Sequence, residues 1–123
     1  MIKEISVNGR AIIKIDNGDI RQAKKLEYSL ASLLALQSET AKVSDKGAAA
    51  YERFTALNDQ MRHVIDSDFG EGTSLKIWGG TPIFALGSGR PLWVNLYTAI
   101  IPMMKHHGPL AKKFLKQFGG DNT

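Results

Sequence analysis

The chain has 123 residues, a net charge of +4 and a hydrophobic content of 43%, the size and composition of one folded domain over 1–123. It contains no cysteine, so disulfides, cysteine-ligated zinc and thiol nucleophiles are excluded, and a reducing cytoplasm fits. No apolar run approaches the roughly 20 residues that a membrane-spanning helix needs. The start of the chain lacks the pattern of a signal peptide, so we expect a cytoplasmic protein with no membrane partner.

Residues 2–16 predict a β-hairpin. Two β-branched runs flank Asn8-Gly9, and both residues of such a pair suit the positive φ angles of a type I′ turn. The second run alternates apolar and charged residues up to Asp16, with Ile12 out of phase. An isolated hairpin is marginally stable in water, so we expect this one to pack on the helices or to pair with another chain.

Residues 19–67 predict two helices that pack as an antiparallel hairpin. Asp19 suits the N-cap of the first helix, and Gln22 follows it at the capping-box spacing. We expect this helix to run to about Lys42 and the second to cover roughly 48–67. The short polar turn between them holds both helices side by side.

Both helices carry an apolar stripe, because apolar residues recur at steps of three and four. Residues 30–36 are apolar nearly all round, which indicates a first helix contacted on two sides. Ser44, Asp45 or Gly47 would cap the second helix. The predicted stripes are Ile20, Ala23, Leu26, Leu30, Leu33 and Leu34 in the first helix, and Tyr51, Phe54, Leu57 or Asn58, Met61, Val64 and Ile65 in the second.

Residues 68–91 predict a Gly-rich joint, and residues 92–118 predict a C-terminal helical unit. Within the joint, 75–78 would form either a short strand or one helical turn. Pro91 suits the first position of the next helix. Pro102 should kink or end that helix, because proline lacks an amide donor, and Gly108-Pro109 is a second break. The whole pattern predicts an α+β fold that is mainly helical.

The sequence offers no catalytic, cofactor-binding or metal-binding set. Asp66 and Asp68 begin like a calcium-binding loop, but the fifth, sixth and twelfth positions do not hold the residues that such a loop requires. His63, His106 and His107 lack the i, i+4 spacing of a shared metal ion. No phosphate-binding glycine motif or nucleophile elbow is present. We therefore expect a protein that is not an enzyme and that needs no cofactor.

Five aromatic residues are the candidates for partner binding: Trp78, Phe84, Trp93, Phe114 and Phe118. Most large aromatics at such spacing belong to a core, whereas an exposed cluster would mark a partner surface. The lysines near the C-terminus lie off the apolar stripe of their helix. A solvated helix face explains them better than a nucleic-acid interface, so we do not expect nucleic acid as a partner.

A short series of motifs spans the joint. Asp66, the run Phe69–Thr73 and the run Ile77–Gly79 are followed by a helix from Trp93 to Met104, and the chain opens with Ile5–Gly9. In these places the sequence resembles the tail assembly chaperones of long-tailed, siphovirus-like bacteriophages and prophages. The resemblance covers most of the chain in outline, but the segment from Gly80 to Pro91 has no counterpart in it.

The resemblance implies a non-enzymatic protein of the host bacterial cytoplasm. Such chaperones coat the tape measure protein, help to recruit tail tube subunits and are absent from the finished particle. A homo-oligomer stays open, because strand edges and apolar helix faces favour protein partners. Two alternatives also stay open: a permanent virion protein of the tail or of the head-tail connector, and a small basic regulator that binds nucleic acid.

Overall fold

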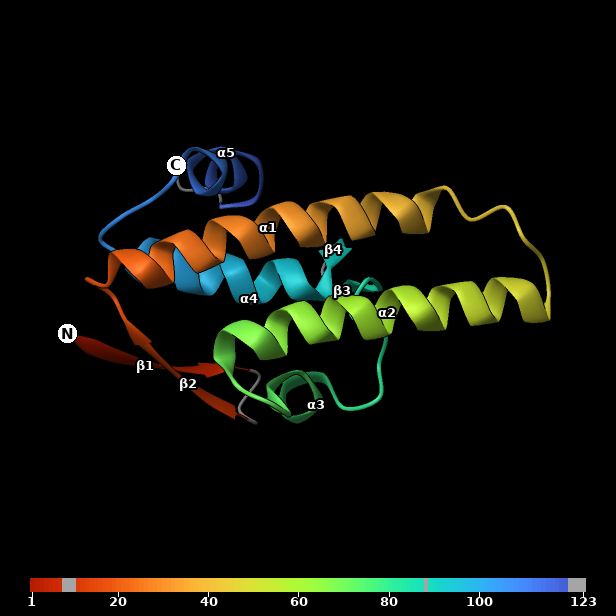
Figure 1. The fold of residues 1–123 in the computed structure, drawn as a ribbon, viewed down its shortest axis with the longest axis horizontal. Helices are drawn as coiled ribbons and strands as arrows, with labels where there is room; N and C mark the ends of the chain where they lie inside the picture. The colour runs from red at the N-terminus through yellow and green to blue at the C-terminus, as the bar shows by residue number, and fades with distance from the viewer. Residues whose placement is uncertain (8–10, 88, 120–123) are drawn as a thin grey trace.

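Two long antiparallel helices form one layer of the molecule, and the other elements pack behind and beside them (Figure 1). The computed structural model describes residues 1–7, 11–87 and 89–119. In chain order the elements are β1 (Ile2–Val7), β2 (Ala11–Asp16), α1 (Ile20–Ala41), α2 (Ala48–Phe69), α3 (Thr73–Trp78), β3 (Leu86–Gly87), β4 (Arg90–Pro91), α4 (Leu92–Ile100), the 3₁₀ turn η1 (Ile101–Met103) and α5 (Pro109–Phe118). The predicted α+β fold, mainly helical, is confirmed.

The N-terminal hairpin is confirmed by an antiparallel register that pairs Ile2 with Asp16 and Ile5 with Ile13. The alternation along β2 is also confirmed, because Ile13 and Ile15 are buried whereas Ile12 is 66% exposed. The predicted turn at Asn8-Gly9 lies outside the described residues. The inner face of the hairpin packs on the helices, since β1 contacts α4 and β2 contacts α3.

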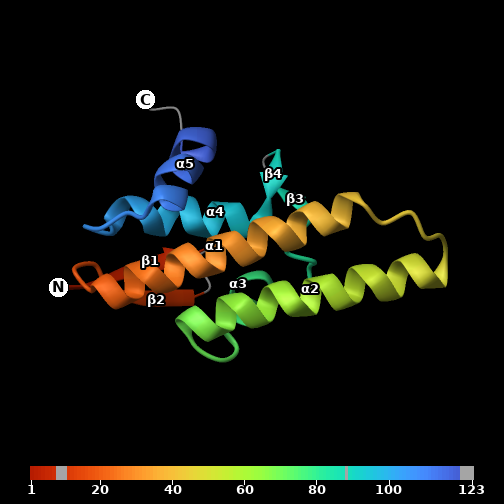
Figure 2. The same cartoon turned by 45° about the horizontal axis from the view of Figure 1, so that its top comes forward.

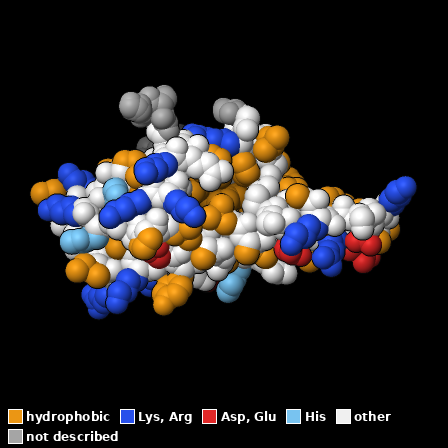
Figure 3. All heavy atoms as spheres, turned by 90° about the horizontal axis from the view of Figure 1, so that it is seen from above, with side chains coloured by type: hydrophobic (Ala, Val, Ile, Leu, Met, Phe, Trp, Pro, Cys, Tyr) orange, Lys and Arg blue, Asp and Glu red, His pale blue; other side chains and the backbone are white. Residues whose placement is uncertain are grey.

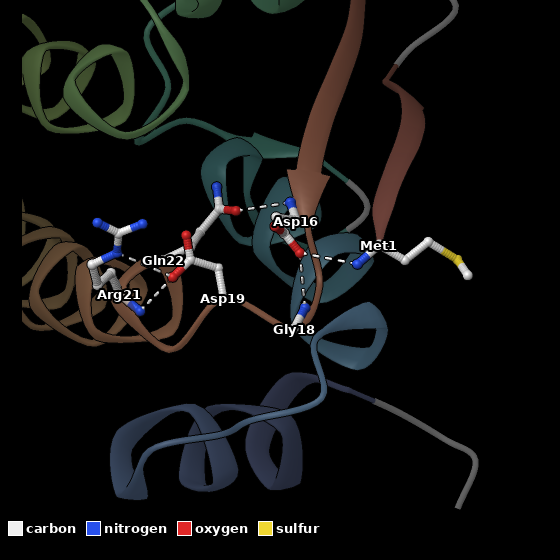
Figure 4. Close-up of polar contacts among 6 residues, drawn as sticks. All are labelled: Met1, Asp16, Gly18, Asp19, Arg21 and Gln22. Atoms are coloured by element: carbon white, nitrogen blue, oxygen red, sulfur yellow. Dashed lines mark hydrogen bonds and ion pairs between the residues drawn. The ribbon is translucent and has the colours of Figure 1, made fainter.

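The start of α1 is fixed by the predicted N-cap, although the capping box is not closed (Figure 4). The Asp19 carboxylate accepts a hydrogen bond from the amide of Arg21 at 2.8 Å. The side chain of Gln22 reaches further back and accepts from the amide of Asp16 at 3.0 Å. Gln22 therefore ties α1 to the end of β2, and the amide of Asp19 bonds instead to the carbonyl of Asp16.

The predicted helical hairpin is confirmed, but two members of its stripes are wrong. Ile20 and Tyr51 are 55% and 73% exposed, because each stands in the first turn of its helix, beyond the packed part of the stripe. Gly47 is the N-cap of α2. That helix ends at Phe69, two residues later than predicted, where Gly70 takes the positive φ of 112° that glycine tolerates best.

Residues 75–78 of the joint form helix and not strand. Residues 73–78 form α3, which buries Ile77 and Trp78 and leaves Leu75 63% exposed. The single turn follows Gly72, whose φ is 85°. Further on, Pro91 is the N-cap of α4 and not its first helical residue, so that prediction is wrong by one position.

The C-terminal unit follows the prediction closely. The α-helix stops at Ile100, and Pro102 lies in η1. Pro109 opens α5 directly after its N-cap Gly108, as expected for a proline whose missing amide would have no helical partner. The two breaks let α5 turn away from α4 and pack across α1 (Figure 2).

The core is continuous from the hairpin to α5. Its centre is α4, where Trp93, Leu96, Tyr97 and Ile100 are all at most 1% exposed. The predicted two-sided contact of α1 is confirmed, because α1 packs on both α2 and α5. Truncation of a fully buried aromatic side chain to alanine costs about 3–5 kcal/mol, so Trp93 and Tyr97 make α4 a strong contributor to packing stability.

A candidate protein-binding groove between the long helices

Three of the five candidate aromatics are core residues. Trp78, Trp93 and Phe114 are 6%, 0% and 2% exposed. The ring of Trp93 lies 5.9 Å from that of Tyr97 and 5.9 Å from that of Phe114, and its Nε1 donates to Oε1 of Gln37 at 3.0 Å. The prediction that these three side chains form a partner surface is therefore wrong, because the fold needs them inside.

The other two candidates are half-buried and lie apart from each other. Phe118 packs its ring 5.1 Å from that of Phe114 on α5. Phe84 stacks on Phe54 of α2 at 5.5 Å and lines an open hollow of about 400 Å³. The other residues of that hollow are Tyr51, Phe54, Thr55, Asn58, Gly80 and Pro82.

A groove of about 620 Å³ lies between α1 and α2. Its lining residues belong to α1 and α2, and in Figure 1 no other labelled helix or strand passes in front of this pair. Apolar atoms make up most of its lining. The lining residues are Ser32, Ala35 and Leu36 of α1, and Asp59, Gln60, His63 and Val64 of α2.

The groove forms because the two helices meet along their core stripes and diverge above them. Leu33, Met61 and Ile65 are fully buried at the contact. Leu36 on α1 and Val64 on α2 lie next to these buried residues around each helix, and both are half-buried against the core. Small or short side chains above them leave room between the helices, so apolar surface stays in contact with solvent.

A second hollow of about 340 Å³, lined by residues with polar side chains, adjoins the groove, and the two share His63. Its other lining residues are Asp66, Ser67 and Glu71. The carboxylate of Asp66 is held in place, because it accepts from the amide of Ser74 at 2.8 Å and from its hydroxyl at 3.3 Å. The joint end of the groove is therefore acidic.

The joint is bound to α2 and is not a free hinge. Nη2 of Arg62 donates to the carbonyls of Gly79 and Thr81, each at 2.6 Å. One turn earlier in α2, the amide side chain of Asn58 accepts from the amide of Ile83 at 2.8 Å. Arg62 and Asn58 therefore have a structural role that no pattern in the sequence predicted.

A buried polar contact joins the middle of α1 to α4 and to the C-terminal end of α2. The hydroxyl of Tyr97 lies 3.0 Å from that of Ser29 and 3.5 Å from Oδ2 of Asp68. Burial raises the pKa of the Asp68 carboxyl above its usual value, although the hydrogen bond with Ser29 and the charge of Lys25 act against the shift. Burial also raises the pKa of Tyr97, which keeps its hydroxyl protonated.

The basic C-terminal helix is docked on α1 through Glu27. The two carboxylate oxygens of Glu27 accept from the amides of Leu110 and Ala111 at 3.0 and 2.7 Å, where the positive end of a helix dipole favours an anion. Lys112, Lys113 and Lys116 then face solvent. Figure 3 looks down on this side and shows Lys and Arg side chains spread over its left half.

The described residues contain no group of three or more His, Cys, Asp or Glu side chains that could hold a metal ion. Within the same residues, no helix combines the length and the apolar character that crossing a membrane requires. The chain matches no protein-family model, no curated protein and no solved structure. The groove is therefore the feature from which a function can be inferred.

The groove itself was not predicted, although one signal pointed toward it. The run 30–36 is apolar nearly all round, which places Leu36 at the edge of the stripe to which the core residue Leu33 belongs. That excess is consistent with a second, less buried surface on α1. Nothing comparable in the sequence marks Ala35, because exposed alanines are common on helices.

Proposed function

We propose that the protein is a non-enzymatic assembly chaperone of the phage tail type, which holds a helical segment of the tape measure protein in the α1–α2 groove. By the same proposal it helps to recruit tail tube subunits in the cytoplasm of the host bacterium. The observation that carries the proposal is the uncovered groove with its floor of Leu36 and Val64. The sequence resemblance at the joint is the reason for choosing the tape measure protein as the partner that the groove binds.

The size and shape of the groove suit a helical client. Recognition of this kind places an amphipathic helix along a groove and inserts its side chains at positions i, i+3 or i+4, and i+7. A third helix lying on α1 and α2 would extend the helix-on-helix packing that the pair already has. The half-buried Leu36 and Val64 would then complete their burial, which stabilises a complex by about 25 cal/mol for each Å² of apolar surface removed from water.

A matched pair of variants tests the site. Ala35 and Ala31 are both exposed on α1, but only Ala35 lines the groove. Ala35→Glu should abolish the binding of tape measure segments in a pull-down, because it places a charge against the apolar floor. Ala31→Glu introduces the same residue one turn away and should leave binding intact. Equal binding by both variants would place the client elsewhere, and no binding by the wild-type protein would sink the chaperone proposal.

The permanent virion protein is separated from the chaperone by a second measurement. Mass spectrometry of purified particles should find the tape measure and tube proteins without this chain. Detection of the chain at a stoichiometric level in the particle would contradict the chaperone proposal and favour a tail or connector component.

A further inference from the structure

The joint end of the groove carries a concentration of negative charge on a protein whose net charge is +4. Asp59 lines the apolar hollow, and Asp66 and Glu71 line the second hollow, which adjoins it. Asp59 and Glu71 are exposed. His63 stands where the two hollows meet, so the groove passes from an apolar stretch beside Ala35 to an acidic stretch beside the joint.

The cations near this acidic stretch do not cancel it. Arg62 interacts electrostatically with Asp59 and Asp66. Its Nη1 donates to the Ser74 hydroxyl, which also bonds Asp66, and its Nη2 is engaged by the carbonyls of Gly79 and Thr81. Lys25 lies near the partly buried carboxyl of Asp68. Among the described residues that line the two hollows, Asp59, Asp66 and Glu71 are acidic and none is Lys or Arg, so the charge of the lining is negative.

Resting on the proposed function, we propose that the groove selects a client helix whose apolar stripe is flanked by Lys or Arg at the end that lies beside the joint. The remainder of the surface supports this selection, since α5 presents Lys112, Lys113 and Lys116 to solvent. A basic client is repelled by that face and attracted by the groove. Such a combination of attraction and repulsion gives specificity more than affinity.

Two synthetic helical peptides test the charge rule without knowledge of the natural client. Both carry the same apolar stripe, and one terminal half is flanked by Lys in the first peptide and by Glu in the second. Fluorescence anisotropy at low salt should show the Lys peptide binding about tenfold more tightly, the result of two or three exposed charge pairs. At 1 M salt, where charges are screened within about 3 Å, the two affinities should converge.

Charge variants of the protein locate the effect. Asp59→Asn with Glu71→Gln should weaken the Lys peptide about fivefold, because two exposed charge pairs are lost. The matched control is Glu4→Gln with Asp45→Asn, two exposed carboxylates on β1 and in the loop after α1. This control changes the net charge equally and should leave the affinity within a factor of about two.

Site-specific labels give the direction in which the peptide lies. The chain has no cysteine, so Ala56→Cys and Ser67→Cys each provide a single labelling position on α2. Both residues are exposed, and a separation of 11 residues along a helix is about 16 Å. A quencher on the Lys-rich end of the peptide should quench the label at position 67 more strongly than the label at position 56.

The outcomes separate the charge rule from the proposed function. If the Glu peptide binds as tightly as the Lys peptide, or if the groove variant and the control behave alike, the charge rule is overturned while groove binding stands. If neither peptide and no tape measure segment binds the wild-type protein, the proposed function fails as well. A dimer that Asp59→Asn with Glu71→Gln dissociates in size-exclusion chromatography would show a second copy as the occupant, which also overturns the rule.

Discussion

The helix α4 and the outer face of the α1–α2 pair both carry apolar residues, and they use them differently. In α4, Trp93 and Tyr97 are fully buried, and they join α1 through Gln37 and Ser29. On the outer face of the pair, Leu36 and Val64 are half-buried and line a groove open to solvent. The comparison shows that an apolar side chain lies at or near a contact between elements. The surrounding elements decide whether that contact buries the side chain fully within the chain.

The two regions also differ in how polar groups are treated. Around α4 the polar groups are paired inside the protein, as in the contact of Tyr97 with Ser29. Along the groove, Asp59, Gln60 and His63 face solvent. Paired polar groups specify one arrangement of a core, whereas exposed ones remain free to meet a partner. Four predictions test this contrast, beginning with the largest expected effect.

Truncation of the central aromatic should break the core and leave the outer face unaffected. Trp93→Ala should lower the free energy of unfolding by about 3–5 kcal/mol, since it opens a cavity and removes the donor to Oε1 of Gln37. Tyr28→Ala removes a side chain that is 77% exposed and should change the same quantity by less than about 0.5 kcal/mol. Urea denaturation measures both, and similar losses would contradict the contrast.

Loss of the contacts that hold the joint on α2 should have the next largest effect on the free energy of unfolding. Arg62→Ala removes two charge-assisted hydrogen bonds of 2.6 Å and should cost about 2–3 kcal/mol. Hydrogen exchange should then show faster exchange in the joint around α3. Arg53→Ala is the control, because Arg53 is exposed and reaches Glu39 only at 3.8 Å. Unchanged exchange in the joint would show that Arg62 does not hold it.

Loss of the contact between α5 and α1 should lower the free energy of unfolding by a smaller amount. A Cβ at Gly108 would lie 2.2 Å from Cδ of Glu27, so Gly108→Ala should force Glu27 out of its capping position and lower the free energy of unfolding by about 1–2 kcal/mol. Gly80→Ala is the matched control, since a Cβ there meets nothing within 4 Å. Thermal unfolding distinguishes them, and equal melting temperatures would mean that Glu27 can move without loss.

The smallest effect concerns Asp68 and depends on pH. Because burial raises its pKa in the folded state, folding favours the protonated form. This stabilisation is fully present below the pKa of the unfolded chain and is lost as pH rises through the raised pKa. Asp68→Asn keeps an acceptor for Tyr97 without the charge, so its melting temperature relative to the wild type should rise between pH 4 and pH 7. A pH-independent difference would contradict the assignment.

Much of the fold could be predicted because the signals were local. The N-cap Asp19, the break at Pro102 and the start of α5 at Pro109 each depend on the backbone chemistry of one or two residues. The periodicity of apolar residues likewise placed Ala23, Leu26, Leu30 and Leu33 on the buried face of α1. The element at 75–78 stayed undecided because four residues are too few for periodicity to separate a strand from a helical turn.

The candidate site was much harder to predict. Exposure of an aromatic depends on what packs against it, so Trp93 and Phe114 could not be assigned to core or surface by spacing alone. The groove depends on Ala35 of α1 and Val64 of α2 lying opposite each other. Their separation in the chain contains a loop, and no local rule sets how two helices meet across it.

The amino-acid sequence by itself determined the helices, their caps and breaks, and which stripes are apolar, because these follow from backbone conformations and from periods of two and 3.6 residues. Only the tertiary structure decided which apolar side chains remain partly exposed to solvent. The burial of a side chain depends on all of its neighbours together. The helix α4 packs on one face of the α1–α2 pair and buries the side chains there. The groove of Leu36 and Val64, with Asp59 on its rim, stays open.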